Sequence, residues 1–124
     1  MSSASARFPG RAPIDAYGNG GFRFADMSHR GSILCLPSGI YAWRPVELAE
    51  LDVAAFAPAL AEKGALGFIL LGTGPCHAMP SAEVRRAFED AGVGLEPMDT
   101  GAACRTYNVL AAEFRRVAAA LFIA

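Results

Sequence analysis

Short apolar segments of strand length alternate with segments of helical periodicity in the second half of the chain. The apolar runs are typical of strands buried on both faces, whereas the segments between them place apolar residues on one helix face. Strands are predicted at residues 66–71, 95–98 and 116–123, and helices at residues 81–91 and 101–113. This alternation predicts an α/β sheet, largely parallel in this half, with helices packed against it.

Residues at the ends of the helical segments support these boundaries. Ser81 and Asp99 can each accept a backbone hydrogen bond from the first turn, and Gly92 stands where a helix commonly ends. Apolar residues at helical spacing predict a further helix at residues 53–63, with Asp52 as its cap.

The first half of the chain has the pattern of antiparallel strands and turns. Residues 15–21 are interpreted as a loop that contains an Asn-Gly turn signal. Alternating apolar residues at 22–27 and an apolar run at 32–36 predict a β-hairpin whose turn lies near residues 28–30. A short extended segment is predicted at residues 40–43.

Length and composition indicate one soluble domain. A chain of 124 residues is long enough for a single core, so residues 13–124 are expected to form the domain and residues 1–12 a disordered or loosely ordered tail. The hydrophobic fraction of 53% predicts a compact core and an apolar contact surface. A net charge of −1 argues against nucleic-acid binding, and no apolar run is long enough to span a membrane directly.

The three cysteines do not form a recognisable motif. Cys35, Cys76 and Cys104 are widely spaced and lack a Cys-x-x-Cys pair, which argues against a disulfide framework or a structural zinc site and favours a reducing compartment. Cys76 and His77 make half of a metal site at most, so no metal and no cofactor are assigned. Cys104 lacks a nearby base in the sequence and is expected to be an inert buried thiol rather than a nucleophile.

Two segments contain the candidate functional residues. The Gly72-Thr73-Gly74 loop leaves the carboxyl end of a predicted strand, where open α/β sheets place ligands, but it lacks the third glycine of a dinucleotide fingerprint and the lysine of a P-loop. A tight turn is the favoured interpretation, and a small-ligand or partner loop is the alternative. Asp99 and Thr100 open a helix, where capping is favoured over anion binding.

The same helix has an unusual concentration of hydrogen-bonding side chains in one turn. These side chains suit either substrate contact or tethering to neighbouring backbone, because buried polar groups must be paired in both cases. No catalytic constellation is recognised. The predicted ligand or partner site therefore consists of Gly72, Thr73, Gly74, Asp99, Thr100, Arg105, Tyr107 and Asn108.

Several of these motifs occur in an order and spacing typical of one family. They are Asp15-Ala16-Tyr17-Gly18, Trp43, Gly72-Thr73-Gly74, Met98-Asp99-Thr100, Thr106-Tyr107-Asn108-Val109-Leu110 and Glu113. From Ile14 to the C-terminus the chain resembles the Mth938-like domain of unknown function, a family that includes mitochondrial complex I assembly factors. Phe114 departs from the family pattern, which favours glycine after Glu113.

The resemblance implies both a fold and a function. It implies a three-layer α/β domain with a central mixed β-sheet, flanking helices and an N-terminal β-hairpin. It also implies a non-catalytic assembly or interaction factor whose partners are respiratory-complex subunits or membrane-associated assembly machinery. Its location would be the cytoplasm in a bacterium, or the mitochondrial matrix for the eukaryotic relatives. The alternative hypothesis is a small-ligand-binding protein or enzyme with a pocket between the Gly72-Thr73-Gly74 loop and the helix at residues 100–108.

Overall fold

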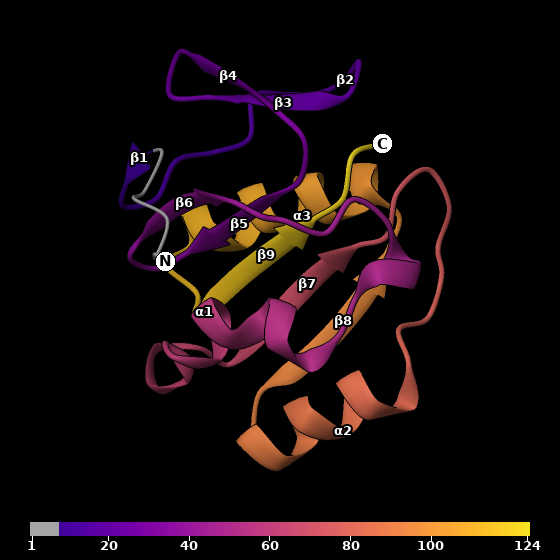
Figure 1. Cartoon of the computed structure of the whole chain (residues 1–124). Helices are drawn as coiled ribbons and strands as arrows, with labels where there is room; N and C mark the ends of the chain where they lie inside the picture. The colour runs from indigo at the N-terminus through magenta and orange to yellow at the C-terminus, as the bar shows by residue number, and fades with distance from the viewer. Residues whose placement is uncertain (1–7) are drawn as a thin grey trace.

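A six-stranded mixed sheet forms the middle layer of the computed structural model, which describes residues 8–124 (Figure 1). The strand order is β1-β6-β5-β9-β7-β8. The bounds are β1 Phe8–Pro9, β5 Ile33–Leu36, β6 Gly39–Ala42, β7 Phe68–Gly72, β8 Gly94–Met98 and β9 Val117–Leu121. Strand β7 runs parallel to β8 and β9, whereas β5 is antiparallel to β6 and β9. The predicted mixed sheet is confirmed.

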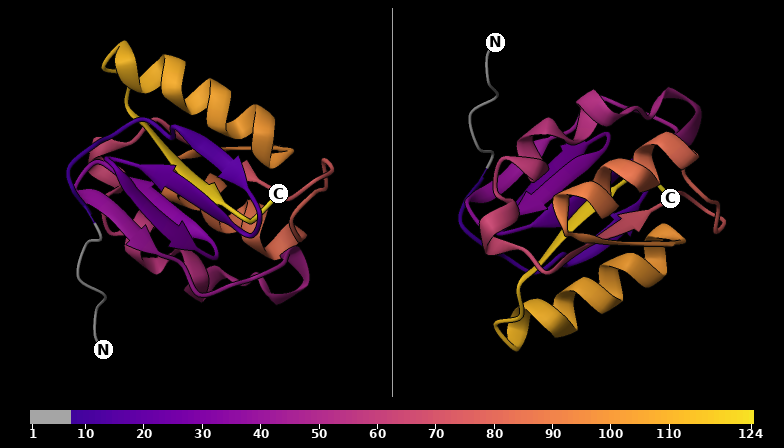
Figure 2. Two further views of the ribbon diagram at one scale, coloured as in Figure 1. Left: turned by 90° about the horizontal axis from the view of Figure 1, so that it is seen from above. Right: turned by 90° about the horizontal axis from the view of Figure 1, so that it is seen from below.

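Helices cover one face of this sheet, and a helix with a second small sheet covers the other (Figure 2). The first face carries the short 3-10 helices η1 (Leu48–Glu50), η2 (Val53–Phe56) and η3 (Lys63–Ala65) with α1 (Ala57–Leu60) and α2 (Ala82–Ala91). The second carries α3 (Thr100–Ala112) and the antiparallel strands β2 (Ala16–Gly18), β3 (Gly21–Phe24) and β4 (Met27–Arg30). The three-layer prediction is therefore confirmed.

Alternating side chains of the middle sheet build a separate core on each face. In β5, Leu34 and Leu36 belong to the core beneath α1 and α2, whereas Ile33 and Cys35 belong to the core beneath α3. Strand β9 is buried along its whole length, and its alanines let both outer layers approach the sheet closely. Each large side chain buried in this way contributes roughly 1.5–3 kcal/mol to folding.

The caps predicted from the sequence are present. Ser81 Oγ accepts a hydrogen bond from Val84 N, and Gly92 ends α2 in the left-handed conformation at φ 73°. Asp52 also caps its segment as predicted, but the helix expected at residues 53–63 is divided into η2 and α1. Pro58 explains the division, because a residue without an amide hydrogen fits the first turn of a helix and not its interior.

The predicted hairpin is wrong in its turn and in its second strand. Residues 28–30 belong to β4, and the turn lies at Ala25 and Asp26, whose φ angles are 48° and 62°. The apolar run at 32–36 becomes β5, which pairs with β6 and β9 in the other sheet. Positive φ at both central residues gives a tight hairpin turn without the usual Asn-Gly signature.

The segment before this hairpin also differs from the prediction. The Asn-Gly turn signal is confirmed, but residues 16–18, expected in a loop, form strand β2. Within the predicted tail, Phe8–Pro9 pairs with β6 as β1, and residues 1–7 lie outside the described residues. The domain boundary at residue 13 stays a prediction. Among residues 8–124, none of the helices combines the length and apolar character of a bilayer-spanning segment.

Candidate functional site

The glycine loop and the first turn of α3 lie in direct contact. Gly74 N donates to Thr100 Oγ1 at 2.9 Å, and Thr100 N donates to Gly74 O at 2.8 Å. Thr100 Oγ1 in turn donates to Phe122 O at 2.7 Å. A Cβ on Gly72 would lie 3.0 Å from Thr100 Oγ1 and 3.1 Å from its Cα, so only glycine permits this approach. The two segments therefore meet, and direct hydrogen bonds join them.

The other polar groups of this junction also have local partners. Thr73 Oγ1 lies 2.6 Å from Cys76 O, to which it donates, and accepts a hydrogen bond from Ala78 N at 3.1 Å. Asp99 Oδ1 accepts from Ala102 N at 2.9 Å and so caps α3. These bonds close a turn and begin a helix, which are the structural roles that the sequence favours.

Three further predicted residues lie on different sides of α3. Arg105 is exposed, and its Nη1 donates to Tyr17 Oη on β2 at 3.1 Å. The side-chain amide of Asn108 bonds to both backbone polar groups of Ile14. Its Oδ1 accepts from Ile14 N at 2.8 Å, and its Nδ2 donates to Ile14 O at 2.9 Å. Tyr107 is fully buried in the core. The structure thus places Arg105 against β2 and Asn108 against the segment that precedes β2, and it separates Tyr107 from both. Their role as a site stays a prediction.

The buried thiols and the buried phenol are held in their neutral forms. Burial raises the pKa of the Cys104 thiol from 9.0 to about 12, although the neighbouring Arg105 partly opposes the shift. Burial also raises the pKa of Cys35 and of Tyr107, and the nearby Cys104 raises that of Cys35 further. Because a thiolate is the nucleophilic form, neither buried cysteine suits covalent catalysis. Among residues 8–124, no cluster of three metal-binding side chains is present.

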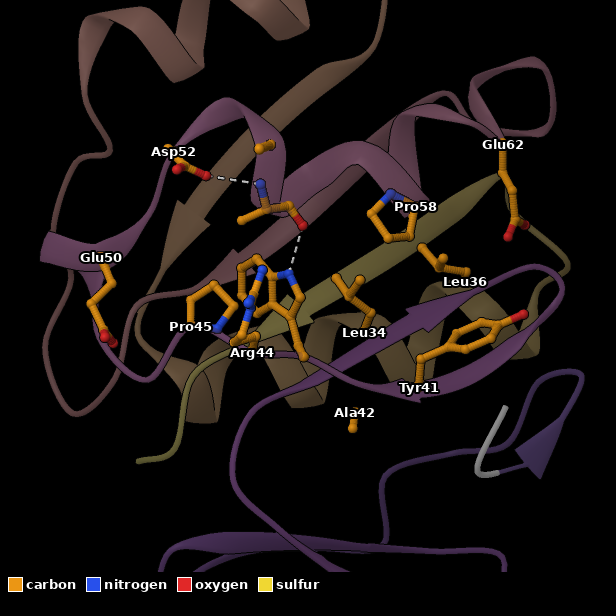
Figure 3. A pocket seen from close by; sticks show the side chains of 13 residues that line it. Leu34, Leu36, Tyr41, Ala42, Arg44, Pro45, Glu50, Asp52, Pro58 and Glu62 are labelled. Carbon is orange, nitrogen blue, oxygen red and sulfur yellow. Dashed lines mark hydrogen bonds between the residues drawn. The ribbon is translucent and has the colours of Figure 1, made fainter. Parts of the chain in front are cut away.

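A pocket that the sequence analysis did not identify lies on the other face of the sheet (Figure 3). Its volume is about 760 Å³, and it is lined by β5, β6 and the segment from Trp43 through α1 to Glu62. The lining residues are Leu34, Leu36, Tyr41, Ala42, Trp43, Arg44, Pro45, Glu50, Asp52, Ala54, Ala55, Pro58 and Glu62. They are spread over about 30 positions. No local sequence motif indicates the pocket.

The outward side of α3 carries exposed apolar side chains. We define the α3 outer face as Arg105, Val109, Ala112 and Phe114, which are all exposed. Val109 is 58% exposed and Phe114 is 91% exposed. The first three follow helical spacing, and Phe114 comes directly after the last turn. An exposed apolar surface of this kind commonly marks a contact with another molecule.

Phe114 has a backbone conformation that usually requires glycine. Its φ angle is 58°, its amide donates to Ala111 O at 3.0 Å, and the amide of Arg115 donates to Leu110 O at 3.0 Å. These bonds form the common helix ending in which a left-handed residue, usually glycine, follows the last turn. The position at which the sequence departs from the family pattern is therefore a position with backbone strain.

Comparison with known proteins places the chain in a family. Residues 14–122 match the family described as "Protein of unknown function (DUF498/DUF598)". The chain belongs to this family. An uncharacterized protein of Rhodobacter capsulatus is 40% identical over 98% of this chain and 92% of its own length. The NADH dehydrogenase (ubiquinone) 1 alpha subcomplex assembly factor 3 of Mus musculus is 26% identical over 98% of this chain, which spans 65% of that protein.

Solved structures of family members have the same fold. A protein of Bartonella henselae, described as an outer membrane protein, is 50% identical with a TM-score of 0.90, covering 94% of this chain and 98% of that one. A Bordetella pertussis protein described as a Mth938-like domain is 28% identical with a TM-score of 0.80, covering 99% of this chain and 92% of its own. The resemblance to the Mth938-like domain is confirmed.

Proposed function

We propose that this protein is a non-catalytic assembly or interaction factor that acts through contacts with other proteins. One observation carries the proposal: the polar groups of the glycine loop and of Thr100 bond to each other, while apolar side chains on α3 stay exposed. A site for chemistry needs polar groups that are available to a substrate. An interaction surface needs apolar groups that a partner can cover.

The α3 outer face has the composition of a protein contact. Arginine and large aromatic residues are enriched among the interface residues that contribute most to binding. Covering Phe114 and Val109 would contribute roughly 3–5 kcal/mol before the costs of association are subtracted. Arg105 lies at the other end of this surface, held by Tyr17.

The names of relatives suggest the kind of partner. Mammalian relatives are named as assembly factors of NADH dehydrogenase (ubiquinone). We therefore propose respiratory-complex subunits or membrane-associated assembly machinery as partners, which the protein would meet in the cytoplasm if it is bacterial. The alternative, a ligand-binding protein or enzyme with a pocket between the Gly72-Thr73-Gly74 loop and residues 100–108, requires the bonds between Gly74 and Thr100 to open.

Affinity capture from gently solubilised native cells tests the proposal. The tagged chain should recover a specific set of proteins, identified by mass spectrometry, and Arg105→Ala or Val109→Asp should reduce their recovery. Arg86→Ala, which removes an exposed arginine from α2, is the matched control and should leave recovery unchanged. Equal recovery by all three variants, or none above background after crosslinking, would contradict a stable contact through α3.

A further inference from the structure

We propose that the pocket in Figure 3 binds an extended segment of a partner protein in which an apolar side chain lies between basic residues. The inference rests on the proposed function because the occupant is part of a partner. It adds a second contact surface on the sheet face opposite α3 and states the chemistry of the segment bound there.

The middle of the pocket is apolar and rigid. Leu34, Leu36 and Pro58 lie together between its two ends in Figure 3. The indole of Trp43 is fixed, because its Nε1 donates to Ala55 O at 2.8 Å and its ring stacks on that of Phe122 with 5.1 Å between the centroids. A preformed open pocket of about 760 Å³ falls within the size range of specific binding pockets, and its apolar middle accommodates a large side chain.

The ends of the pocket carry negative charge. Glu50 and Asp52 lie at one end and Glu62 at the opposite end. Among the residues that line the pocket, Arg44 is the one basic side chain, so three carboxylates and one guanidinium leave a formal charge of −2. Exposed charges of this kind add little affinity, but they discriminate between partners of opposite sign. A segment with lysine or arginine on both sides of its apolar residue matches this arrangement.

The carboxylates are held in place by the fold before any partner arrives. Glu50 Oε1 accepts from Val46 N at 2.8 Å, and Asp52 Oδ1 accepts from Ala55 N at 2.9 Å. Glu62 Oε2 accepts from Ser38 Oγ at 2.5 Å. Side chains fixed in this way lose little conformational freedom when a basic group binds beside them.

The placement of charge at the two ends of the pocket favours an extended peptide over a compact small molecule. Glu50 and Asp52 are separated from Glu62 by the apolar side chains of Leu34, Leu36 and Pro58. A chain that contacts both ends at once spans the apolar middle of the pocket and places a side chain there.

A peptide titration followed by NMR tests the inference directly. The probe is acetyl-Lys-Leu-Phe-Leu-Lys-amide, and the control is the same peptide with both lysines replaced by glutamate. Each is added to the ¹⁵N-labelled full chain, whose single tryptophan, Trp43, provides an indole resonance inside the pocket. The basic peptide should shift this resonance and the amides of Ala54 and Ala55, and it should bind about fivefold or more tightly than the acidic one.

Charge variants test whether the carboxylates at the ends of the pocket recognise the basic residues of the peptide. The double variant Glu50→Gln, Asp52→Asn removes two charges but keeps side chains that can accept the same backbone hydrogen bonds. It should lower the affinity for the basic peptide about fivefold. The variant Glu89→Gln, Asp90→Asn makes the same charge change on exposed positions of α2 and should leave binding unchanged. Arg44→Gln should tighten binding.

Three results would overturn the inference: equal affinity for the two peptides, equal weakening by the α2 control, or no shift of the pocket resonances by either peptide. The proposed function is tested separately, because the capture experiment varies α3 and leaves the pocket intact. A failed titration with partner recovery that still depends on Arg105 and Val109 would remove this inference alone.

Discussion

Replacing Phe114 with glycine is expected to stabilise the protein. At φ 58° a residue with a side chain costs roughly 1–2 kcal/mol relative to glycine. Glycine loses more conformational freedom on folding, which costs roughly 0.5–1 kcal/mol. Because Phe114 is 91% exposed, little buried area is lost. The difference leaves a gain of about 0.5–1 kcal/mol in the free energy of unfolding.

Urea and thermal unfolding measure this gain. A rise in Tm of about 2–4 °C is expected for a domain of this size. Phe114→Ala is the matched control: it removes the aromatic ring but keeps a Cβ at the same φ, so it should not stabilise. A glycine variant no more stable than the alanine variant would refute the assignment of strain. If Phe114 also contacts a partner, the stabilised glycine variant should recover less of that partner in the capture experiment.

Further substitutions, and the pH dependence of unfolding, test how the buried polar groups contribute to stability. Asn108→Ala should lower the free energy of unfolding by about 2–3 kcal/mol, because it leaves the Ile14 amide and carbonyl unpaired. Urea unfolding measures this loss, and Asn108→Asp, which keeps an acceptor for the Ile14 amide, is the comparison variant. Tyr107→Phe should be neutral or stabilising, since the buried hydroxyl has no hydrogen-bond partner among the described residues, and a loss above about 1 kcal/mol would contradict this. The raised pKa of Cys104 favours the neutral thiol in the folded state, so its contribution to stability is complete below pH 9 and should be lost as the pH rises toward about 12. Urea unfolding under reducing conditions should show this decline, and Cys104→Ala should make it shallower.

The second half of the fold was predictable because its signals are local. Ser81, Gly92 and Asp99 each end or begin a helix through contacts with residues a few positions away. The buried strands β7 and β9 are continuous apolar runs that need no partner to be recognised. Parallel pairing then follows from the helices that connect the strands.

The hairpin could not be placed from the sequence because its turn lacks a signature. Ala25 and Asp26 adopt positive φ under the constraint of paired strands, and neither residue favours this strongly by itself. The apolar pattern of the sequence therefore runs through the turn to residue 27 without a break. Strand β5 pairs with β9, about 85 positions away, and such a contact leaves no local pattern.

The sequence indicated the candidate residues but could not give their contacts. The contact between Gly74 and Thr100 and the tether from Asn108 to Ile14 both depend on packing between distant segments. Sequence could indicate that these polar groups need partners, but only the structure identifies the partners. The pocket was missed because Leu36 and Glu62, like its other lining residues, come from separate elements.

The amount of assembled NADH dehydrogenase complex in native membranes tests the proposed assembly role most directly. Cells that lack this protein should contain less of the complete complex on a native gel and should accumulate smaller subassemblies. The wild-type chain should restore the complex, whereas a chain with Arg105→Ala and Val109→Asp should not, although it reaches the same cellular level. Complex of normal amount and activity in cells that lack the protein would contradict the assembly role.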